Sequence, residues 1–283
     1  MQQGFVVSLI VSGLYIYPVK SCQAVPLQAS PVTQSGLLFD RRFMVINKEG
    51  LFLTAREYPQ LTLIDAKSVQ HGLVLTHPSM SNPLPLEIET FTNEYRETEI
   101  WEKPVSANIT HPSANAWFSE LLNQPVELVY FGEHSTRFTS RRPDQPVAFA
   151  DGYPFLLTTQ ASLDDLNKSG PQINEMERFR PNIVISGNEA FNEDAWKRIR
   201  IGDVIFENVK PCVRCLFITL DPDTAERSPK GEPLRTLAKY RLFDKEGVTF
   251  GVNLVTENEG VIAVGDEVEI LEYQTPYAYT DKR

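Results

Sequence analysis

The sequence predicts a mostly β fold (α+β) with a few short helices, built as two closely packed, barrel-like units. Short apolar runs broken by turn residues recur along the 283 residues, and few segments show helical spacing. Hydrophobic residues make up 42% and charged residues 23% of the chain, ordinary values for a globular protein that can bury a real core. Neither GxGxxG nor GxxxxGKS/T occurs, so nucleotide-binding folds lack their usual signal.

The N-terminal half contains a candidate hairpin and a candidate helix. Residues 42–47 and 51–55 are rich in β-forming residues and flank 48–50, whose length and final glycine are typical of a hairpin loop. Residues 113–122 carry apolar side chains at helical spacing, with Ser113 as the expected N-cap. Further strands are expected at 61–65, 72–76, 98–102 and 126–131.

The C-terminal half repeats this alternation of short strands and turns. Residues 162–168 predict a short helix, and 182–186 predict a buried strand. Gly-Asp turns at Gly202 and Gly265 each precede a strand with alternating apolar residues. A late helix is expected over 233–240, with a proline near its first turn.

The polar, basic and proline-containing stretch 134–146 is the natural boundary between the two units. It predicts an N-terminal domain over 8–132, a C-terminal domain over 133–275 and a tail over 276–283.

Residues 5–17 form an apolar run of about 13 residues, whereas a membrane span needs roughly 20. No Lys or Arg precedes the run, so the positive end of a signal peptide is missing. Its Val, Ile and Tyr content predicts a buried strand, with a loosely held extension before Leu14. We therefore expect an unexported, cytoplasmic protein. The net charge of -10 argues against general binding to nucleic acid or to anionic membranes, but leaves room for a local basic pocket.

Three cysteines, Cys22, Cys212 and Cys215, are too few for a disulfide scaffold and indicate a reducing compartment. Cys22 is expected to be a small buried hydrophobe. The last two stand in Val-Lys-Pro-Cys-Val-Arg-Cys, which permits a zinc site, a thiol redox pair or a single thiolate ligand to a soft metal. No paired His or Cys completes a zinc site, and 216–220 reads as a strand rather than the helix that a redox pair opens. The spacing alone does not choose a metal.

Basic residues stand in polar, turn-like contexts at Lys20, Arg41, Arg56 and Arg180. Arginine offers a planar fork of donors that suits phosphate, and lysine a compact charge. Each of them alone is ordinarily a solvated surface charge. Anion binding would require them to converge in space.

Eight short motifs occur in one order along the chain: Tyr17-Pro-Val-Lys-Ser21, Phe39-Asp-Arg41, Thr54-Ala-Arg56, Asp151-Gly-Tyr-Pro-Phe155, Phe179-Arg-Pro-Asn-Ile183, Ile201-Gly-Asp203, Pro211-Cys-Val-Arg-Cys215 and Phe250-Gly-Val-Asn253. Together they resemble the MOSC-domain proteins, in the branch of the mitochondrial amidoxime-reducing component and its bacterial YcbX-type relatives. The resemblance runs from about Leu14 to Leu271. It implies an N-terminal MOSC β-barrel-like domain packed on a C-terminal MOSC β-barrel.

The resemblance also implies a molybdenum cofactor, Mo-molybdopterin, with Cys212 as the protein ligand to the metal and as the catalytic residue. The implied cofactor-binding residues are Lys20, Ser21, Arg41, Arg180, Asn182, Cys212 and Asn253. Asn253 departs from the mitochondrial members, which carry tyrosine there. Arg56, Asp151, Arg142 and Cys215 are expected to flank the same pocket. Pyridoxal phosphate binding is a further family-level label.

The implied reaction is two-electron reduction of the N–O bond in N-hydroxylated compounds, with the oxygen leaving as water. YcbX-type relatives often carry a C-terminal ferredoxin-like domain, but no cysteine follows Cys215, so the sequence as given cannot hold an iron–sulfur cluster. Either the sequence is part of a longer protein, or the electrons come from a separate ferredoxin- or flavin-type donor protein, which the resemblance leads us to expect. The alternatives are a cofactor carrier or sulfur-transfer module without turnover, and a thiol redox protein that uses Cys212 and Cys215 as a pair.

Overall fold

The protein is described by a computed structural model that covers residues 8–243 and 245–283. Its strands are β1 (Ile10–Ile16), β2 (Val25–Leu27), β3 (Ala29–Thr33), β4 (Gly36–Leu37), β5 (Phe43–Asn47), β6 (Asp65–Val69), β7 (Gly72–Thr76), β8 (Leu84–Glu87), β9 (Tyr95–Ile100), β10 (Lys103–Ile109), β11 (Val126–Tyr130), β12 (Phe155–Thr159), β13 (Ile183–Ser186), β14 (Trp196–Ile201), β15 (Val204–Val213), β16 (Leu242–Phe243), β17 (Gly247–Thr256), β18 (Gly260–Ala263) and β19 (Val268–Tyr273).

The described helices are few and short, as the sequence predicts. The α-helices are α1 (Pro112–Leu122), α2 (Gln160–Ser169) and α3 (Leu234–Leu237), and the 3-10 helices are η1 (Pro59–Leu63), η2 (Ile88–Thr90), η3 (Met176–Phe179), η4 (Asn192–Ala195) and η5 (Leu216–Thr219). None of these helices has the length and apolar character that crossing a membrane would require.

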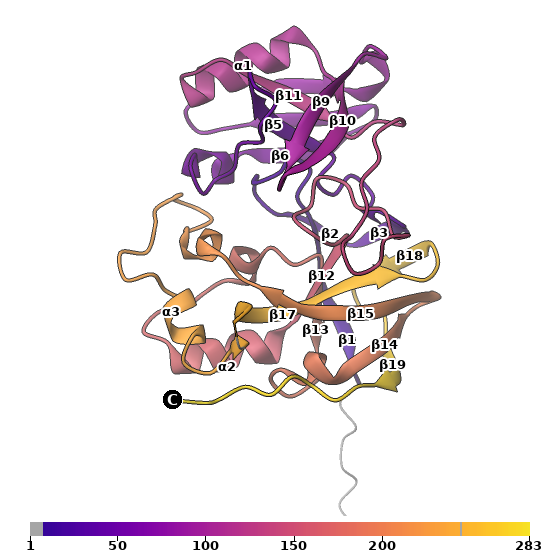
Figure 1. Ribbon diagram of the computed structural model, residues 1–283, viewed down its shortest axis with the longest axis vertical. Helices are drawn as coiled ribbons and strands as arrows, with labels where there is room; N and C mark the ends of the chain where they lie inside the picture. Colours follow the sequence, from indigo (N-terminus) through magenta and orange to yellow (C-terminus); the bar gives the residue numbers. More distant parts are fainter. Residues whose placement is uncertain (1–7, 244) are drawn as a thin grey trace, which may run out of the picture.

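The lower half in Figure 1 is organised by a nine-stranded sheet. Its strands follow the order β19-β14-β15-β17-β12-β13-β1-β2, and β16 pairs with β17 beside this path. Strand β1 therefore lies in the sheet of the C-terminal half, where it pairs antiparallel with β13. A small sheet of β18, β3 and β4 adds a second link between the start and the end of the chain.

The upper half contains a four-stranded sheet, β5-β11-β10-β9, and a three-stranded sheet, β6-β7-β8, with α1 beside them (Figure 1). Both sheets are antiparallel throughout, which permits one apolar and one polar face. The mostly β fold is thus confirmed, in the form of several open sheets rather than a closed barrel.

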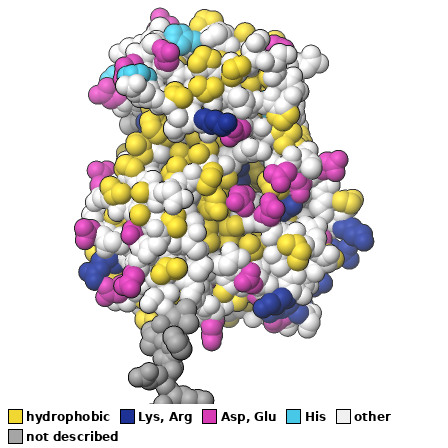
Figure 2. All heavy atoms as spheres, turned by 180° about the vertical axis from the view of Figure 1, so that it is seen from behind, with side chains coloured by type: hydrophobic (Ala, Val, Ile, Leu, Met, Phe, Trp, Pro, Cys, Tyr) yellow, Lys and Arg dark blue, Asp and Glu magenta, His cyan; other side chains and the backbone are white. Residues whose placement is uncertain are grey.

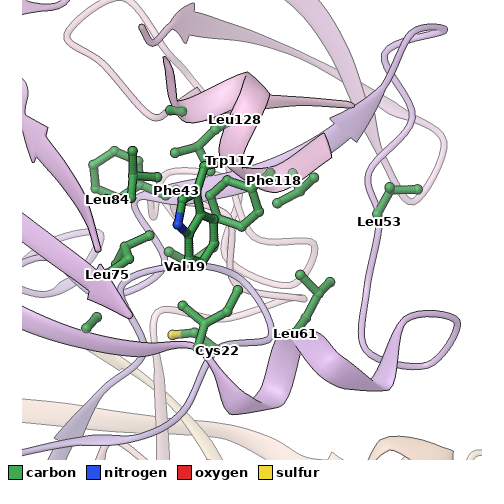
Figure 3. Packing of buried hydrophobic residues seen from close by; sticks show 14 of the residues in the cluster. Val19, Cys22, Phe43, Leu53, Leu61, Leu75, Leu84, Trp117, Phe118 and Leu128 are labelled. Atoms are coloured by element: carbon green, nitrogen blue, oxygen red, sulfur yellow. The ribbon is translucent and has the colours of Figure 1, made fainter. Parts of the chain in front are cut away.

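The core of the upper half is formed by side chains from both of its sheets and from α1. Figure 3 shows Phe43, Leu75 and Leu84 from the strands packing against Trp117 and Phe118 of α1. The indole N–H of Trp117 donates to the carbonyl oxygen of Asn82 at 2.9 Å, so its one polar group is satisfied.

Cys22 lies in the same core and is fully buried, which confirms the expectation of a small buried hydrophobe. Burial raises the pKa of its thiol to about 11, because the thiolate would lose its hydration there. A separate core in the lower half is formed on the large sheet by residues such as Phe155, Phe206 and Leu254.

Several predicted elements are confirmed nearly residue for residue. The strand at 72–76 is β7, that at 126–131 is β11, and that at 182–186 is β13. The helix expected at 162–168 is α2. Its N-cap is Thr159, whose hydroxyl oxygen accepts a hydrogen bond from the N–H of Ser162. Both Gly-Asp turns feed the expected strands, β15 and β19.

Two predicted strands are wrong because 3-10 helices take their place. Residues 61–65 fall mostly in η1, which begins at Pro59, a residue suited to the first turn of a helix. Residues 216–220 form η5, in which the Thr219 hydroxyl donates back to the carbonyl oxygen of Leu216 at 2.7 Å. Local side-chain bonds of this kind compete with a strand ladder.

Other boundaries also differ from the predictions. The expected N-cap Ser113 lies inside α1, which begins at Pro112. The strand expected at 98–102 is β9, which ends before the turn at 101–102, and the late helix at 233–240 is reduced to α3. The second strand of the predicted hairpin, 51–55, is reduced to isolated bridges, from Phe52 to Ile46 and from Leu51 to Glu99, while β5 pairs along its length with β11.

The expected loose extension before Leu14 is wrong for the residues that the structure describes. Ile10 and Val11 pair with Ser186 and Ile185 of β13, so these positions belong to the large sheet. Residues 5–7 of the apolar run lie outside the described residues.

Candidate functional site

One open cavity collects most of the residues that the sequence singles out. It contains about 870 Å³ of empty space, part of it open to solvent. The expected site residues that line it are Lys20, Ser21, Arg41, Arg56, Asp151, Arg180, Asn182, Cys212, Cys215 and Asn253. These residues come from segments far apart in the sequence, and the fold brings their side chains together around one cavity. Figure 2 shows apolar side chains gathered where the upper and lower halves meet, seen from behind.

Cys212 lies near the end of β15 and is half-buried, whereas Cys215 is exposed. The Arg214 guanidinium donates to the Cys212 sulfur at 3.0 Å and to the carbonyl oxygen of Phe179 at 2.7 Å. The sulfur of Cys212 therefore lies beside the positive charge of Arg214. Cys215 precedes the four-residue η5 rather than an α-helix, so a redox pair lacks the usual helix N-terminus.

Lys20 is buried, and its ammonium group bridges two parts of the cavity wall. It donates to the carbonyl oxygen of Phe149 at 2.8 Å and to the carboxylate of Asp151 at 2.5 Å. Burial lowers the pKa of Lys20, and the nearby Asp151 carboxylate opposes this shift. The wall of the cavity therefore carries an ammonium group that can donate a proton, with a carboxylate beside it.

Ser21 and Asn182 line the cavity but also support the backbone around it. The Ser21 hydroxyl oxygen accepts from the N–H of Ala55 at 3.1 Å. The side-chain oxygen of Asn182 accepts from the N–H of Leu156 at 3.1 Å, and its NH₂ group donates to Tyr15 at 3.2 Å. Asn182 is thus largely satisfied within the protein. Among the described residues, the side-chain amide of Asn253 makes a single, long contact of 3.5 Å, to the carbonyl oxygen of Pro211.

Arg41 and Arg180 differ in how their charges are balanced. Arg41 donates to both oxygens of the buried Asp40 carboxylate, at 2.8 and 2.6 Å. Arg180 donates to the carbonyl oxygen of Cys22 at 2.5 Å, and it forms no salt bridge with any described carboxylate. Desolvation, and then repulsion by Arg41, lowers the pKa of Arg180 to about 10. Its charge is therefore available to an incoming anion.

Three of the lining residues hold backbone conformations that side chains rarely adopt. Ser21, Arg41 and Arg180 have φ values of 79°, 46° and 57°. Such left-handed geometry in non-glycine residues persists where the surroundings enforce it, often at functional sites.

Arg142 does not lie in this cavity, unlike the other expected residues. Its guanidinium donates twice to Glu207, once at 3.0 Å, and Lys197 donates to the same carboxylate at 2.7 Å. The hydrogen bond from Arg142, together with Lys197, lowers the pKa of Glu207 to about 2 despite partial desolvation. The neighbouring Arg141 pairs with Glu246 at 3.4 Å.

The cavity also contains residues that sequence reasoning did not select. They include Thr54, Phe179, Arg214 and Phe217. Thr54 and Arg214 stand inside the motifs quoted above. Thr54 lies two residues before Arg56, and Arg214 lies between Cys212 and Cys215, so the sequence contained a signal that they belong to the site. The buried hydroxyl of Tyr153 and the buried Nε of Arg214 have no hydrogen-bond partner among the described residues. Orphaned polar atoms at a cavity wall are suited to a polar ligand.

The donor set can be compared with what an anionic metal cofactor requires. Within residues 8–243 and 245–283, no three His, Cys, Asp or Glu side chains gather as a metal-ligand group. The cavity offers two soft sulfurs, at Cys212 and Cys215, together with cations from Lys20, Arg41 and Arg180. These residues fit a cofactor that brings its own metal donors and an anionic group.

Two family descriptions match consecutive parts of the chain. The MOSC N-terminal beta barrel domain matches residues 8–125, and the MOSC domain matches residues 144–269. Mitochondrial amidoxime-reducing component 1 of Homo sapiens is 38% identical over 92% of this chain and 82% of its own length. Mitochondrial amidoxime reducing component 2 of Homo sapiens is 36% identical over 91% and 82%.

More distant similarity extends to other proteins. Component 1 of Danio rerio is 32% identical over 93% of this chain and 85% of its own length. Among solved structures, the YUAD protein of Bacillus subtilis is similar over 94% of this chain and 97% of its own, at 12% identity and a TM-score of 0.45.

Proposed function

The chain belongs to the MOSC-domain family of the amidoxime-reducing components, and from this membership we propose that it reduces N-hydroxylated compounds with a molybdenum cofactor. The observation that carries the proposal is the meeting of the Cys212 thiol with the unbalanced cation of Arg180 in one cavity. A soft sulfur donor and an anion-binding group are the two contacts that such a cofactor needs from a protein.

Each part of the cavity has a role in this proposal. Cys212 would supply the protein ligand to the metal, held by the hydrogen bond from Arg214. Lys20, Ser21, Arg41 and Arg180 would bind the phosphate and pterin, since charged donors make short, strong bonds to phosphate. In the proposal the amides of Asn182 and Asn253 complete the wall beside them.

The reaction consumes two electrons and two protons for each N–O bond, and it releases one molecule of water. The bound cofactor would supply the redox chemistry. The residues of this chain would orient the N-hydroxyl group and hold protons, and the buried Lys20 ammonium beside Asp151 holds one at the cavity wall. We propose a separate protein as the electron donor.

The first experiment measures molybdenum and pterin in the purified protein, produced in a host that makes the cofactor. We expect near-stoichiometric content in the wild type and its loss in Cys212→Ala. Cys215→Ala is the matched control, because Cys215 is exposed on the same cavity and is not proposed as a ligand. A folded wild type without metal or pterin would contradict the cofactor proposal.

Turnover separates the reductase from a carrier or sulfur-transfer module. The loaded protein is given a chemical reductant and benzamidoxime, and formation of benzamidine is followed. Reduction that depends on Cys212 and not on Cys215 supports the reductase and contradicts a thiol redox pair. Stoichiometric cofactor without any turnover would favour the carrier.

A further inference from the structure

Tyr17 is a fully buried residue at the end of β1 that does not itself line the cavity. Its aromatic ring nevertheless contacts both arginines of the cavity wall. The guanidinium carbon of Arg41 lies 4.1 Å from the ring centroid, and that of Arg180 lies 4.0 Å from it. Cations over an aromatic face at such distances are attracted by the electrons of the ring.

Hydrogen bonds tie the same tyrosine to the backbone of both arginine segments. The Tyr17 N–H donates to the Asp40 carboxylate at 2.8 Å, and its carbonyl oxygen accepts from the N–H of Arg41 at 3.0 Å. On the other side, its hydroxyl donates to the carbonyl oxygen of Pro181 at 3.2 Å. Tyr17 thus touches the two chain segments whose arginines adopt left-handed backbone geometry.

The arrangement also answers a problem of charge. Arg41 and Arg180 carry like charges close together, and the Arg41 guanidinium even donates to the carbonyl oxygen of Arg180 at 3.2 Å. Asp40 balances Arg41, but no described carboxylate pairs with Arg180. An aromatic ring stabilises the second cation without neutralising it, so the charge remains available to a ligand.

We propose that Tyr17 is a positioning residue that holds Arg41 and Arg180 in the geometry that binds the anionic group of the cofactor. The aromatic ring carries this role, and the hydroxyl bond to Pro181 is secondary. The inference rests on the proposed function, since it concerns the same site.

The test compares Tyr17→Leu with Tyr17→Phe in the full chain. Inorganic phosphate is titrated by calorimetry into protein made in a host without the cofactor, and molybdenum content is measured after production in a host that has it. Tyr17→Leu should bind phosphate about tenfold more weakly and hold much less molybdenum, because two cation–π contacts are lost. Tyr17→Phe keeps the ring and should stay within about twofold of the wild type.

Tyr240→Leu is the matched control. Tyr240 is also buried, and Arg283 lies 3.8 Å from its ring centroid, but it does not line the cavity. Its replacement should leave phosphate affinity and molybdenum content unchanged. Loss of binding in Tyr240→Leu equal to that in Tyr17→Leu would mean that the effect is general loss of folding, and the proposal would be overturned.

A further variant covers the case in which Tyr17→Leu does not fold. Arg180→Lys keeps the charge but lacks the planar group that stacks on the ring, so it should bind phosphate more weakly than the wild type and more tightly than Arg180→Ala. Wild-type affinity in Arg180→Lys, or equal losses in Tyr17→Phe and Tyr17→Leu, would overturn the role of the ring. A wild type that holds no molybdenum or pterin would instead contradict the proposed function, whatever the variants do.

Discussion

Arg180 in the cavity and Arg241 in the lower core lie against aromatic rings in much the same way, yet only Arg241 is paired with a carboxylate. The Arg180 guanidinium carbon lies 4.0 Å from the Tyr17 centroid and 5.0 Å from that of Phe217. That of Arg241 lies 4.3 Å from the Phe191 centroid and 3.9 Å from that of Tyr279. In each case the rings fix a planar cation in place.

The difference is the carboxylate. Arg241 makes two contacts with Asp194, at 2.8 and 3.1 Å, and both side chains are only 4% exposed. Desolvation would lower the pKa of Arg241, but Asp194 raises it, whereas the pKa of Arg180 is lowered to about 10. Arg241, with aromatic rings and a carboxylate around it, therefore belongs to a structural cluster. Arg180, with aromatic rings but no paired carboxylate among the described residues, can bind an anionic ligand.

Replacement of Arg241, the arginine paired with Asp194, should have the largest effect on stability. Arg241→Met leaves Asp194 buried and charged beside the buried Glu193, and the loss of one partner of a buried pair typically costs about 3–5 kcal/mol. We expect that decrease in the free energy of unfolding in urea. Arg198→Ala, which breaks an exposed pair with Glu257, is the control and should change little. Unchanged stability in Arg241→Met would show that the cluster does not support the fold.

Glu193 gives the cluster a dependence on pH. Desolvation, and then repulsion by Asp194, raises the pKa of the fully buried Glu193 from its ordinary value of 4.5 to about 7, against hydrogen bonding from Ser162. A raised carboxyl pKa gives stability that is present below 4.5 and is lost as the pH rises through about 7.

Glu193→Gln removes this titration. Between pH 5 and pH 8 the variant should become more stable relative to the wild type, with a free energy of unfolding that is larger by up to about 3 kcal/mol, as measured by urea unfolding at each pH. Parallel curves for the two proteins over that range would contradict the raised pKa.

Removal of the unbalanced arginine should affect binding more than folding. Arg180→Ala loses a charge-assisted contact worth about 1.5–3 kcal/mol, so cofactor retention should fall at least tenfold with little change in melting temperature. Arg142→Ala is the matched control, because Arg142 is paired with Glu207 outside the cavity and should retain full molybdenum. Full retention together with a much lower melting temperature in Arg180→Ala would make Arg180 a structural residue.

The sequence predicted the residue types of the site better than their surroundings. Cys212 and Arg180 stand in short motifs that predicted a thiol ligand and a phosphate-binding cation, and both residues line the cavity. Arg142 looked equivalent, but its partner Glu207 lies on a strand far along the chain, and no local pattern reveals such a pair. The same holds for Tyr17, whose contact with the distant Arg180 exists only after folding.

For the fold, short apolar runs rich in β-forming residues and bounded by turn residues predicted β7 and β13 well. The failures, at η1 and η5, are apolar runs of a few residues, for which strand and helix cannot be distinguished by periodicity. Left-handed backbone at Ser21 and Arg41 also had no signal, since neither position holds glycine.

The place of β1 in the large sheet has a consequence for the order of events during synthesis. Leu14 emerges early from the ribosome, but its partner Ile183 is made only after the whole upper half of the molecule. Closure of so long a loop is slow and entropically costly, so β1 must wait for its neighbour while the upper sheets form. A cut of the chain near residue 133 would separate these two strands, and each half would keep an unpaired edge prone to aggregation.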